Sequence, residues 1–349
     1  MQEIDGGQLE GGGQIIRTSC SLAALKQFDL SIHSIRKNRP NPGLADQHVV
    51  CITSIADICS IPVDQVKVKQ TTLVFEGSKG KNFNENIVKT FKMQGAGSCC
   101  LVLQSLLPLC FGIPGNHQLT ICGGTHALWA PTPEYYSEIL SPALKNMGIG
   151  MNIQLKKYGF FPRGGGEMTC FIDSPKEILP ITMIQRGNPK SIVARIICGN
   201  QLDISEYQKV IRDTLRKEIR INGEPVPIEF YHQSVPYCKT MIVELLIECE
   251  GGKLSSYCVQ EKKESISQLV ERSINKLLEE YQHGGCCDEY LQDQLIIPMA
   301  FARGHSSISC GEISLHTQTM FVIIKQLLNV EFIVRKEGSM NIIETDGMK

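Results

Sequence analysis

Glycine clusters recur at turns in the first 180 residues, and they constrain the fold more than any other feature of the sequence. Segments with helical spacing of apolar residues alternate with strand-like segments, and the glycine-rich turns separate them. Glycine permits positive φ and close approach of the backbone, so one cluster indicates a tight turn, whereas four favour a shared anionic site. The alternation predicts repeated helix-and-strand units in an α/β or α+β fold. The clusters are GGQLEGGGQ (6–14), GAGS (95–98), GGT (123–125) and RGGGE (163–167).

The spacing of apolar residues also predicts individual elements. We expect helices at 19–28, 43–60 and 96–112, the last too apolar to lie at the surface, and a helix that ends at Gly148. Residues 65–77 have the pattern of two short strands around a polar turn. From about residue 184 the sequence is richer in charge and poorer in glycine turns. There it predicts a strand–helix–strand–strand set, followed by a helix at about 262–281, which favours a separate or inserted domain.

Composition limits the class of protein. The 349 residues suggest two domains, and the net charge of −1 argues against a protein that coats nucleic acid along its length. A small pocket for one phosphorylated end remains compatible with this charge. No apolar run is long enough to span a bilayer, and the first residues do not have the pattern of a signal peptide. The 15 cysteines include no CxxC pair, so we expect buried, reduced thiols of an intracellular protein.

Two basic stretches near the N-terminus are candidates for anion binding. In EGGGQIIR, a helix that begins near Gly13 would place Gln14 and Arg17 one turn apart on one face, at a helix N-terminus that favours anions. The stretch is neither a Walker loop nor a Rossmann fingerprint. In SIRKNRPNPGLADQH, Arg36 and Arg39 precede a Pro-Gly turn and could clamp phosphates, although an isolated pair is more often a solvated basic turn.

Two further stretches lie near the C-terminus. In DEYLQDQL, Tyr290 and Asp293 are three apart on a predicted helix, where they could stack a base and hold a ribose or a metal. From the residues alone, an acidic first helical turn is the preferred interpretation. His316 stands at the start of an amphipathic helix and is a competent nucleophile in its neutral form. A lone histidine is more often structural, and its spacing does not decide between the two roles.

Taken together, seven stretches resemble the RNA 3′-terminal phosphate cyclase family, and they occur in the family's order between residues 5 and 320. The last two most resemble its eukaryotic branch. The stretches are DGGQLEGGGQIIR, IRKNRPNPGLADQH, GAGSCCLVLQ, GGTHALWAP, GFFPRGGGE, HGGCCDEYLQDQLIIPMA and SLHTQT.

The resemblance implies an ATP-dependent enzyme of the ligase class. It implies that a histidine, here His316, takes AMP from ATP and releases pyrophosphate. AMP then passes to an RNA 3′-phosphate, and the neighbouring 2′-hydroxyl closes a 2′,3′-cyclic phosphate. Mg²⁺ or Mn²⁺ is the implied metal, with Glu10 as its ligand. The positions implied near the phosphates, the RNA end and the metal are Glu10, Arg17, Arg36, Arg39, Gln47 and His48, and those in the nucleotide pocket are Gln104, Pro131, Tyr290, Leu291, Gln292, Asp293 and Gln294.

The resemblance also implies the architecture and the location. It implies a large domain (1–183 and 282–349) of three repeated units, each with two helices on a four-stranded sheet, similar to the C-terminal domain of translation initiation factor 3. A smaller α/β domain (184–281) is inserted. The implied partners are ATP and RNA 3′-phosphate ends, without a membrane, and the implied location is the nucleus. The oligomeric state and the metal preference stay open.

Some residues depart from the family's pattern. His126 stands where the family usually has Asn or Asp, and 234–245 and 255–263 lack glycines that are often present there. Two alternatives therefore stay open. One is a non-catalytic, cyclase-like protein of ribosomal RNA processing, against which the intact SLHTQT stretch argues. The other is a divergent relative that only binds RNA ends.

Overall fold

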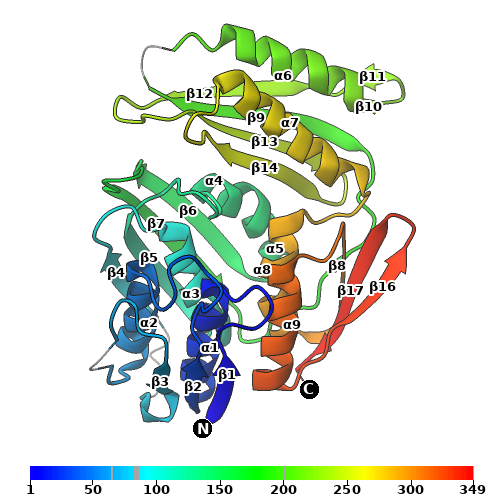
Figure 1. Ribbon diagram of the computed structural model, residues 1–349. Coiled ribbons are helices and arrows are strands. Elements are labelled where there is room, and N and C mark those ends of the chain that lie inside the picture. The colour runs from blue at the N-terminus through cyan, green and yellow to red at the C-terminus, as the bar shows by residue number, and fades with distance from the viewer. Residues whose placement is uncertain (64–65, 82–85, 200–201, 349) are drawn as a thin grey trace.

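The computed structural model describes residues 1–63, 66–81, 86–199 and 202–348. Its fold is mixed α and β, with several small sheets and helices between their strands, as the alternating pattern predicted (Figure 1). In the described part of the chain, no helix is long and apolar enough to cross a membrane.

The N-terminal sheet has three strands in the described residues, in the order β1-β2-β3. Strand β1 is parallel to β2, and β2 is antiparallel to β3. Here four strands were expected. Of the two strands predicted over 65–77, only β3 forms, residues 66–72 are not a strand, and residue 65 lies outside the described residues. The elements are β1 (Gln2–Asp5), α1 (Gly13–Lys26), β2 (Asp29–His33), α2 (Asp46–Cys59), β3 (Leu73–Glu76) and the short helix η1 (Gly77–Lys79).

Two further sheets share one topology of four strands. Their orders are β4-β5-β7-β6 and β8-β15-β17-β16, and in both the first pair is parallel and the other two are antiparallel. Two helical segments accompany each sheet. The first set is β4 (Val88–Lys92), α3 (Cys99–Gly112), β5 (Gly115–Gly123), the helical run α4 (Pro133–Tyr135), η2 (Tyr136–Leu140) and α5 (Ser141–Lys145), β6 (Gly150–Lys157) and β7 (Gly166–Ser174); the second is β8 (Thr182–Met183), α8 (Glu289–Phe301), β15 (Arg303–Cys310), α9 (Leu315–Leu328), β16 (Ile333–Glu337) and β17 (Met340–Gly347).

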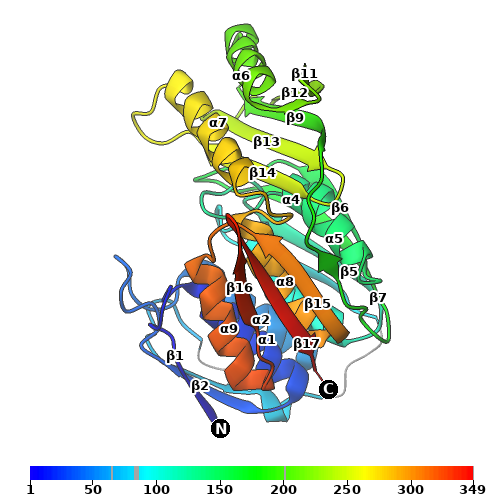
Figure 2. The same ribbon diagram turned by 90° about the vertical axis from the view of Figure 1, so that its right-hand side faces the viewer.

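A fourth sheet is built only from strands between residues 189 and 259, in the order β12-β9-β13-β14. It lies with α6 and α7 at one end of the molecule, away from both termini, in both views (Figures 1 and 2). Its apolar side chains form a cluster of their own with those of α6 and α7. The elements are β9 (Pro189–Cys198), α6 (Ser205–Glu218), β10 (Arg220–Ile221), β11 (Glu224–Pro225), β12 (Ile228–Ser234), β13 (Ile242–Cys249), β14 (Lys253–Val259) and α7 (Ile266–Gln282).

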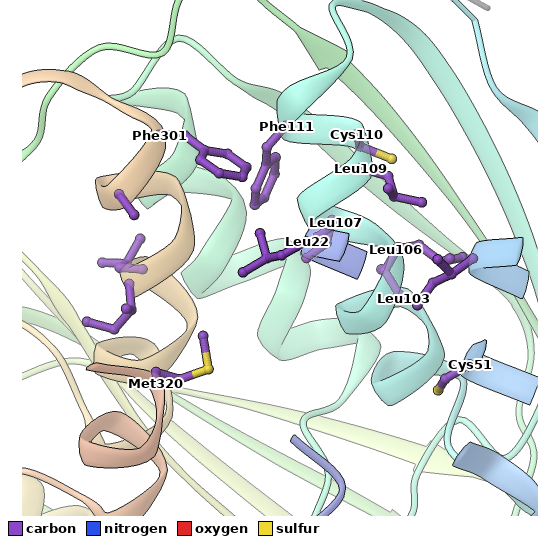
Figure 3. Close-up of a cluster of buried hydrophobic side chains, with 14 of the residues drawn as sticks. Leu22, Cys51, Leu103, Leu106, Leu107, Leu109, Cys110, Phe111, Phe301 and Met320 are labelled. Carbon is purple, nitrogen blue, oxygen red and sulfur yellow. The ribbon is translucent and has the colours of Figure 1, made fainter. Parts of the chain in front are cut away.

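The main core lies where five helices meet. Leu22 of α1, Cys51 of α2, Leu103 of α3, Phe301 of α8 and Met320 of α9 gather in one apolar cluster (Figure 3). Helix α3 is buried along nearly its whole length, as its apolar sequence predicted. The core therefore brings three helices from the first 112 residues against two helices that lie beyond residue 288.

Several sequence predictions need correction or stay open. Strand β14 was missed, because its SSY sequence is polar although four of its residues are buried. The helix expected to end at Gly148 ends earlier, at Lys145. All 15 cysteines are free, and all but Cys122 are buried. The division into domains at 184 and 281 and the likeness to translation initiation factor 3 stay predictions.

Candidate active site

His316 lies in the first turn of α9. The helix begins there because Ser314 caps it, with its hydroxyl accepting a hydrogen bond from the backbone N–H of Thr317 at 3.1 Å. Gln292 of α8 fixes the segment before the cap. Its side-chain amide donates to the carbonyl of Glu312 at 3.1 Å and accepts from the N–H of Ser314 at 3.2 Å. Hydrogen bonds thus fix the backbone both before and after His316.

Three side chains from three helices form a chain of hydrogen bonds at this point. Nδ1 of His316 lies 2.8 Å from Oε1 of Gln14, which is the second residue of α1. Nε2 of the same glutamine donates to Oδ2 of Asp293 in α8, also at 2.8 Å. Gln14 is almost completely buried, whereas the residue His316 stays exposed to solvent. A ligand can therefore reach the imidazole of His316, while Gln14 fixes its Nδ1 edge.

A buried guanidinium lies beside this chain. Arg17 is 7% exposed, and its NH2 group donates to Oε1 of Gln104 at 3.0 Å, while its Nε has no hydrogen-bond partner in the structure. Burial lowers the pKa of Arg17, and Asp293 acts in the opposite direction. A guanidinium remains charged in proteins, so the site holds a fixed positive charge with an unused donor. Such a donor suits a phosphate oxygen.

Desolvation and Arg17 set the protonation of the nearby titratable groups. Desolvation and the charge of Arg17 lower the pKa of His316, whereas Glu289 acts to raise it. Burial also raises the pKa of Asp293 to about 7, and Arg17 opposes that shift. His316 is accordingly neutral at physiological pH, which is the form that can act as a nucleophile.

The glycine turn before α1 lets side chains approach the backbone closely. A Cβ at Gly13 would lie 2.2 Å from Nε2 of His48, and one at Gly12 would lie 2.1 Å from Oε1 of Glu10. Both clashes are with side-chain atoms, so a side chain at Gly12 or Gly13 would displace Glu10 or His48 from its place beside the turn. Burial first, and then the charges of Arg17 and Arg36, lower the pKa of His48 to about 3. His48 is therefore a neutral neighbour of the turn.

The structure distributes the other candidates for the RNA end around this turn. Glu10 pairs with the exposed Arg39, while its Oε2 is buried without a hydrogen-bond partner. Arg36 donates to the carbonyl of Gly43 at 2.8 Å, so one nitrogen of its guanidinium is used in a hydrogen bond within its own loop. Gln47 of α2 accepts from the backbone N–H of Ser98 at 2.8 Å and so joins that helix to the GAGS turn. Of the two arginines, Arg39 is the freer to meet a ligand.

The candidates for the nucleotide pocket fall into two groups. Tyr290 accepts a hydrogen bond from Lys276 at 3.3 Å and meets the ring of Tyr135 edge-on at 6.1 Å. The partly buried Pro131 precedes Thr132, which caps the helix that carries Tyr135, so Pro131 and Tyr290 belong to one neighbourhood. Asp293 instead contacts Gln14. Tyr290 and Asp293 therefore serve different contacts, although the sequence placed them on one helical face.

Other members of the predicted pocket pack in the core or form hydrogen bonds to backbone atoms. Leu291 belongs to the apolar core, and Gln292 holds the start of α9. Gln294 donates to the carbonyl of Tyr290, and its Oε1 is buried with no partner. Gln104 and Gln294 line a narrow pocket beside Gln14 and Asp293. These two glutamines are the ones placed next to the His316 site.

Sequence reasoning missed Asp288. This wholly buried carboxylate caps α8 and also accepts from the hydroxyl of Tyr135 at 2.7 Å and from the backbone and side chain of Ser255 at 2.9 and 3.0 Å. It thereby joins α8 to α4 and to β14. The Asp before a helix was visible as a cap signal, but its distant partners were not.

His126, a departure from the family's pattern, lies in a second buried polar cluster. Its Nε2 is 3.1 Å from Glu134, and its ring lies beside those of Tyr158, Phe160 and Tyr257. Arg195 of β9 pairs with Glu138 and with Glu244 of β13 in the same region. This cluster joins the β12-β9-β13-β14 sheet to the segment after β5. Its charges are paired within the protein.

The geometry of the His316 site suits nucleotide and phosphate chemistry. It combines an exposed neutral imidazole, a buried guanidinium with a free donor and a buried carboxylate oxygen of Glu10 without a partner. Among the described residues, no three His, Cys, Asp or Glu side chains come together as a metal cage. Mg²⁺ is commonly bound by one or two carboxylates together with water and substrate phosphates. Glu10 fits that kind of site.

Comparison with known proteins agrees with this chemistry. A model of the RNA 3′-terminal phosphate cyclase family matches residues 8–334. A protein of Dictyostelium discoideum called probable RNA 3′-terminal phosphate cyclase is 32% identical over 340 residues, which cover 95% of this chain and 78% of that protein. RNA 3′-terminal phosphate cyclases of Methanococcoides burtonii and Drosophila melanogaster are 31% and 27% identical, over 97% and 100% of this chain and 98% and 97% of theirs. The chain belongs to the RNA 3′-terminal phosphate cyclase family.

Proposed function

We propose that this protein uses ATP to convert an RNA 3′-terminal phosphate into a 2′,3′-cyclic phosphate, with His316 as the nucleophile. One observation carries the proposal: an exposed, neutral imidazole is held at a fixed orientation beside a buried arginine that has an unused donor. Membership of the cyclase family and relatives named for this activity support the same reaction class.

The reaction proceeds in three steps that balance. The Nε2 lone pair of His316 attacks the α-phosphorus of ATP, and the bond to the β-phosphate oxygen breaks, so pyrophosphate leaves. An oxygen of the RNA 3′-phosphate then attacks the same phosphorus, and the N–P bond returns its electrons to the imidazole. Finally the 2′-hydroxyl attacks the RNA phosphorus, loses its proton and expels AMP. The last step is intramolecular and gains from a high effective concentration.

The residues around His316 have separable tasks in this proposal. Arg17 stabilises negative charge on the phosphates, and Arg39 and Arg36 hold the RNA end. Gln104 and Gln294 contact the nucleotide beside the narrow pocket, while Tyr290 and Pro131 flank its base. A Mg²⁺ ion at Glu10 supplies Lewis-acid stabilisation of phosphate oxygens when it is bound. We also propose a nuclear location, which fractionation of cells checks.

Covalent labelling tests the nucleophile. Incubation with α-³²P-ATP and Mg²⁺ should label the protein through an acid-labile, base-stable bond, as expected of a phosphoramidate. His316→Ala should remove the label while the thermal unfolding curve stays close to that of the wild type. Equal labelling of the variant would contradict the assignment. A protein that only binds RNA ends would bind RNA and take no label.

A set of three short RNAs tests the complete reaction. An RNA with a 3′-phosphate should become cyclic with consumption of ATP, and an RNA with a 3′-hydroxyl should not react. An RNA with a 3′-phosphate on a 2′-deoxy sugar should stop as the adenylylated intermediate, because the internal nucleophile is missing. Identical products from the ribose and deoxyribose ends would rule out this mechanism.

A further inference from the structure

We propose that Asp293 acts through Gln14 to fix the tautomer of His316, which places the proton on Nδ1 and leaves the lone pair on Nε2. Asp293 is thus a positioning residue for the nucleophile, and not only part of a nucleotide pocket. The inference rests on the proposed function of His316, and it deepens that function by assigning how the nucleophilic nitrogen is selected.

The contacts come from three helices that are far apart in the sequence. Gln14 lies in α1, Asp293 in α8 and His316 in α9, and both hydrogen bonds that link them are 2.8 Å long. Gln14 is 4% exposed, so its amide has little water to exchange with. The three side chains form one chain of polar contacts that ends at the reacting ring.

The direction of these hydrogen bonds follows from the chemistry of the groups. An ionised carboxylate only accepts hydrogen bonds, so the NH₂ group of Gln14 must face Asp293. The amide oxygen then faces His316, and an oxygen of this kind also only accepts. Nδ1 of His316 must therefore donate, and a neutral imidazole with Nδ1–H carries its lone pair on Nε2. While Asp293 is ionised, the two hydrogen bonds therefore fix both the amide orientation of Gln14 and the tautomer of His316.

His48, at the same site, provides an internal contrast. The backbone N–H of Ala45 donates to its Nδ1 at 3.0 Å, so that nitrogen accepts and the proton sits on Nε2. The two histidines therefore have opposite tautomers, each determined by the partner of Nδ1. Only His316 presents an unprotonated Nε2.

The retained Nδ1 proton also matters after the attack. When Nε2 bonds to phosphorus, the ring becomes cationic, and Nδ1–H continues to donate to Gln14. The carboxylate of Asp293, one residue further along the chain of contacts, favours this positive charge. When the RNA phosphate displaces the ring, a neutral imidazole leaves with the same proton in place. No proton has to move at His316 in either transfer.

The first test is a nitrogen NMR spectrum of the wild-type protein labelled with ¹⁵N at its histidine rings. It is recorded at pH 8, because burial raises the pKa of Asp293 to about 7. His316→Ala and His48→Asn identify the two signals. We expect Nδ1–H with a bare Nε2 for His316, and the reverse for His48. A His316 ring protonated on Nε2 in the wild-type protein would overturn the inference.

The second test removes the relay and then restores it. Gln14→Met should mix the tautomers of His316 and slow label formation by about 10–100-fold, the usual effect of losing an orienting partner. The double variant Gln14→Glu with Asp293→Asn keeps the net charge and lets the central carboxylate accept from both neighbours. It should restore the wild-type tautomer and most of the labelling rate.

A control variant is available, and failure of the relay can be told apart from failure of the proposed function. The control is Gln318→Met in α9, the helix that carries His316. The side chain of Gln318 donates to the carbonyl of Ile313, and its loss should change neither the tautomer of His316 nor the labelling rate. If the double variant keeps the slow rate and the mixed tautomers of Gln14→Met, the relay is wrong. If His316→Ala still takes the label, the proposed function itself fails, whatever tautomer the spectrum shows.

Discussion

Two buried polar clusters in this protein use charge differently. In the His316 cluster, Arg17 bonds to an uncharged amide and keeps Nε free, and the chain of contacts ends at an exposed imidazole. In the Arg195 cluster, the guanidinium lies between two carboxylates, Glu138 and Glu244. The first cluster leaves capacity for a ligand, whereas the second consumes its charge within the fold. The His316 cluster is Gln14, Arg17, Gln104, Asp293 and His316, and the Arg195 cluster is His126, Glu134, Glu138, Arg195 and Glu244.

This difference teaches how to separate a functional cluster from a structural one. Buried charge alone does not distinguish them, because both clusters hold a mostly buried arginine. What differs is the partner: a fully paired guanidinium has nothing left to offer a phosphate.

Removal of Arg17 should affect chemistry far more than stability. Arg17→Met should slow formation of the covalent label by about 100–1000-fold, the usual loss when a preorganised donor to developing charge is removed. Its unfolding midpoint should change much less than that of Arg195→Met. Labelling kinetics and thermal unfolding of the two variants give the comparison. A wild-type labelling rate would contradict the role of Arg17.

Removal of Arg195 should affect stability far more than chemistry. Arg195→Met leaves Glu244 buried without its cation, and breaking a buried pair in this way costs about 3–5 kcal/mol of unfolding free energy. Denaturant unfolding measures the loss. Glu138→Gln is the matched control, because that carboxylate is more exposed and its change should cost about 1 kcal/mol or less. A loss of only about 1 kcal/mol or less in Arg195→Met would contradict the structural role of the Arg195–Glu244 pair.

The stability should depend on pH through Asp293. Its pKa is raised from 3.8 to about 7 by burial, so between these values the folded state holds a proton that the unfolded state has lost. The contribution of Asp293 to the unfolding free energy should therefore be complete below pH 4 and should be lost as the pH rises towards 7. Asp293→Asn should flatten this slope but not remove it, because burial also raises the pKa of Asp288 to about 6. Unfolding curves from pH 4 to 8 provide the measurement, and an unchanged slope would contradict the assignment.

Arg39 should have the smallest effect on stability. It is exposed, and its ion pair with Glu10 contributes about 0–1 kcal/mol. Arg39→Ala should therefore leave the unfolding midpoint close to the wild type, whereas reaction with an RNA 3′-phosphate should weaken. Label formation from ATP alone should change less than the RNA reaction. If the RNA reaction is unaffected at subsaturating RNA, Arg39 does not hold the RNA end.

Local patterns were sufficient for most of the individual elements. The apolar run of α3 predicted a buried helix, and the amphipathic pattern that follows His316 predicted α9 and its start. Such signals are short-range, because caps and periodicity depend on neighbours within one or two turns. Prediction failed at β14 and at 66–72, where tertiary pairing and not the local pattern decides whether a strand forms.

The sequence by itself determined the inventory of the site: a glycine-rich turn, Arg17 one turn into the helix that follows it, and a histidine at a helix start. Only the tertiary structure decided their grouping, because Gln14 and His316 are 302 residues apart and meet through packing of α1 against α9. It also separated Asp293 from Tyr290, which the helical spacing had joined. The physical reason is that hydrogen-bond partners depend on distance and direction in space, and a linear pattern carries neither across a whole chain.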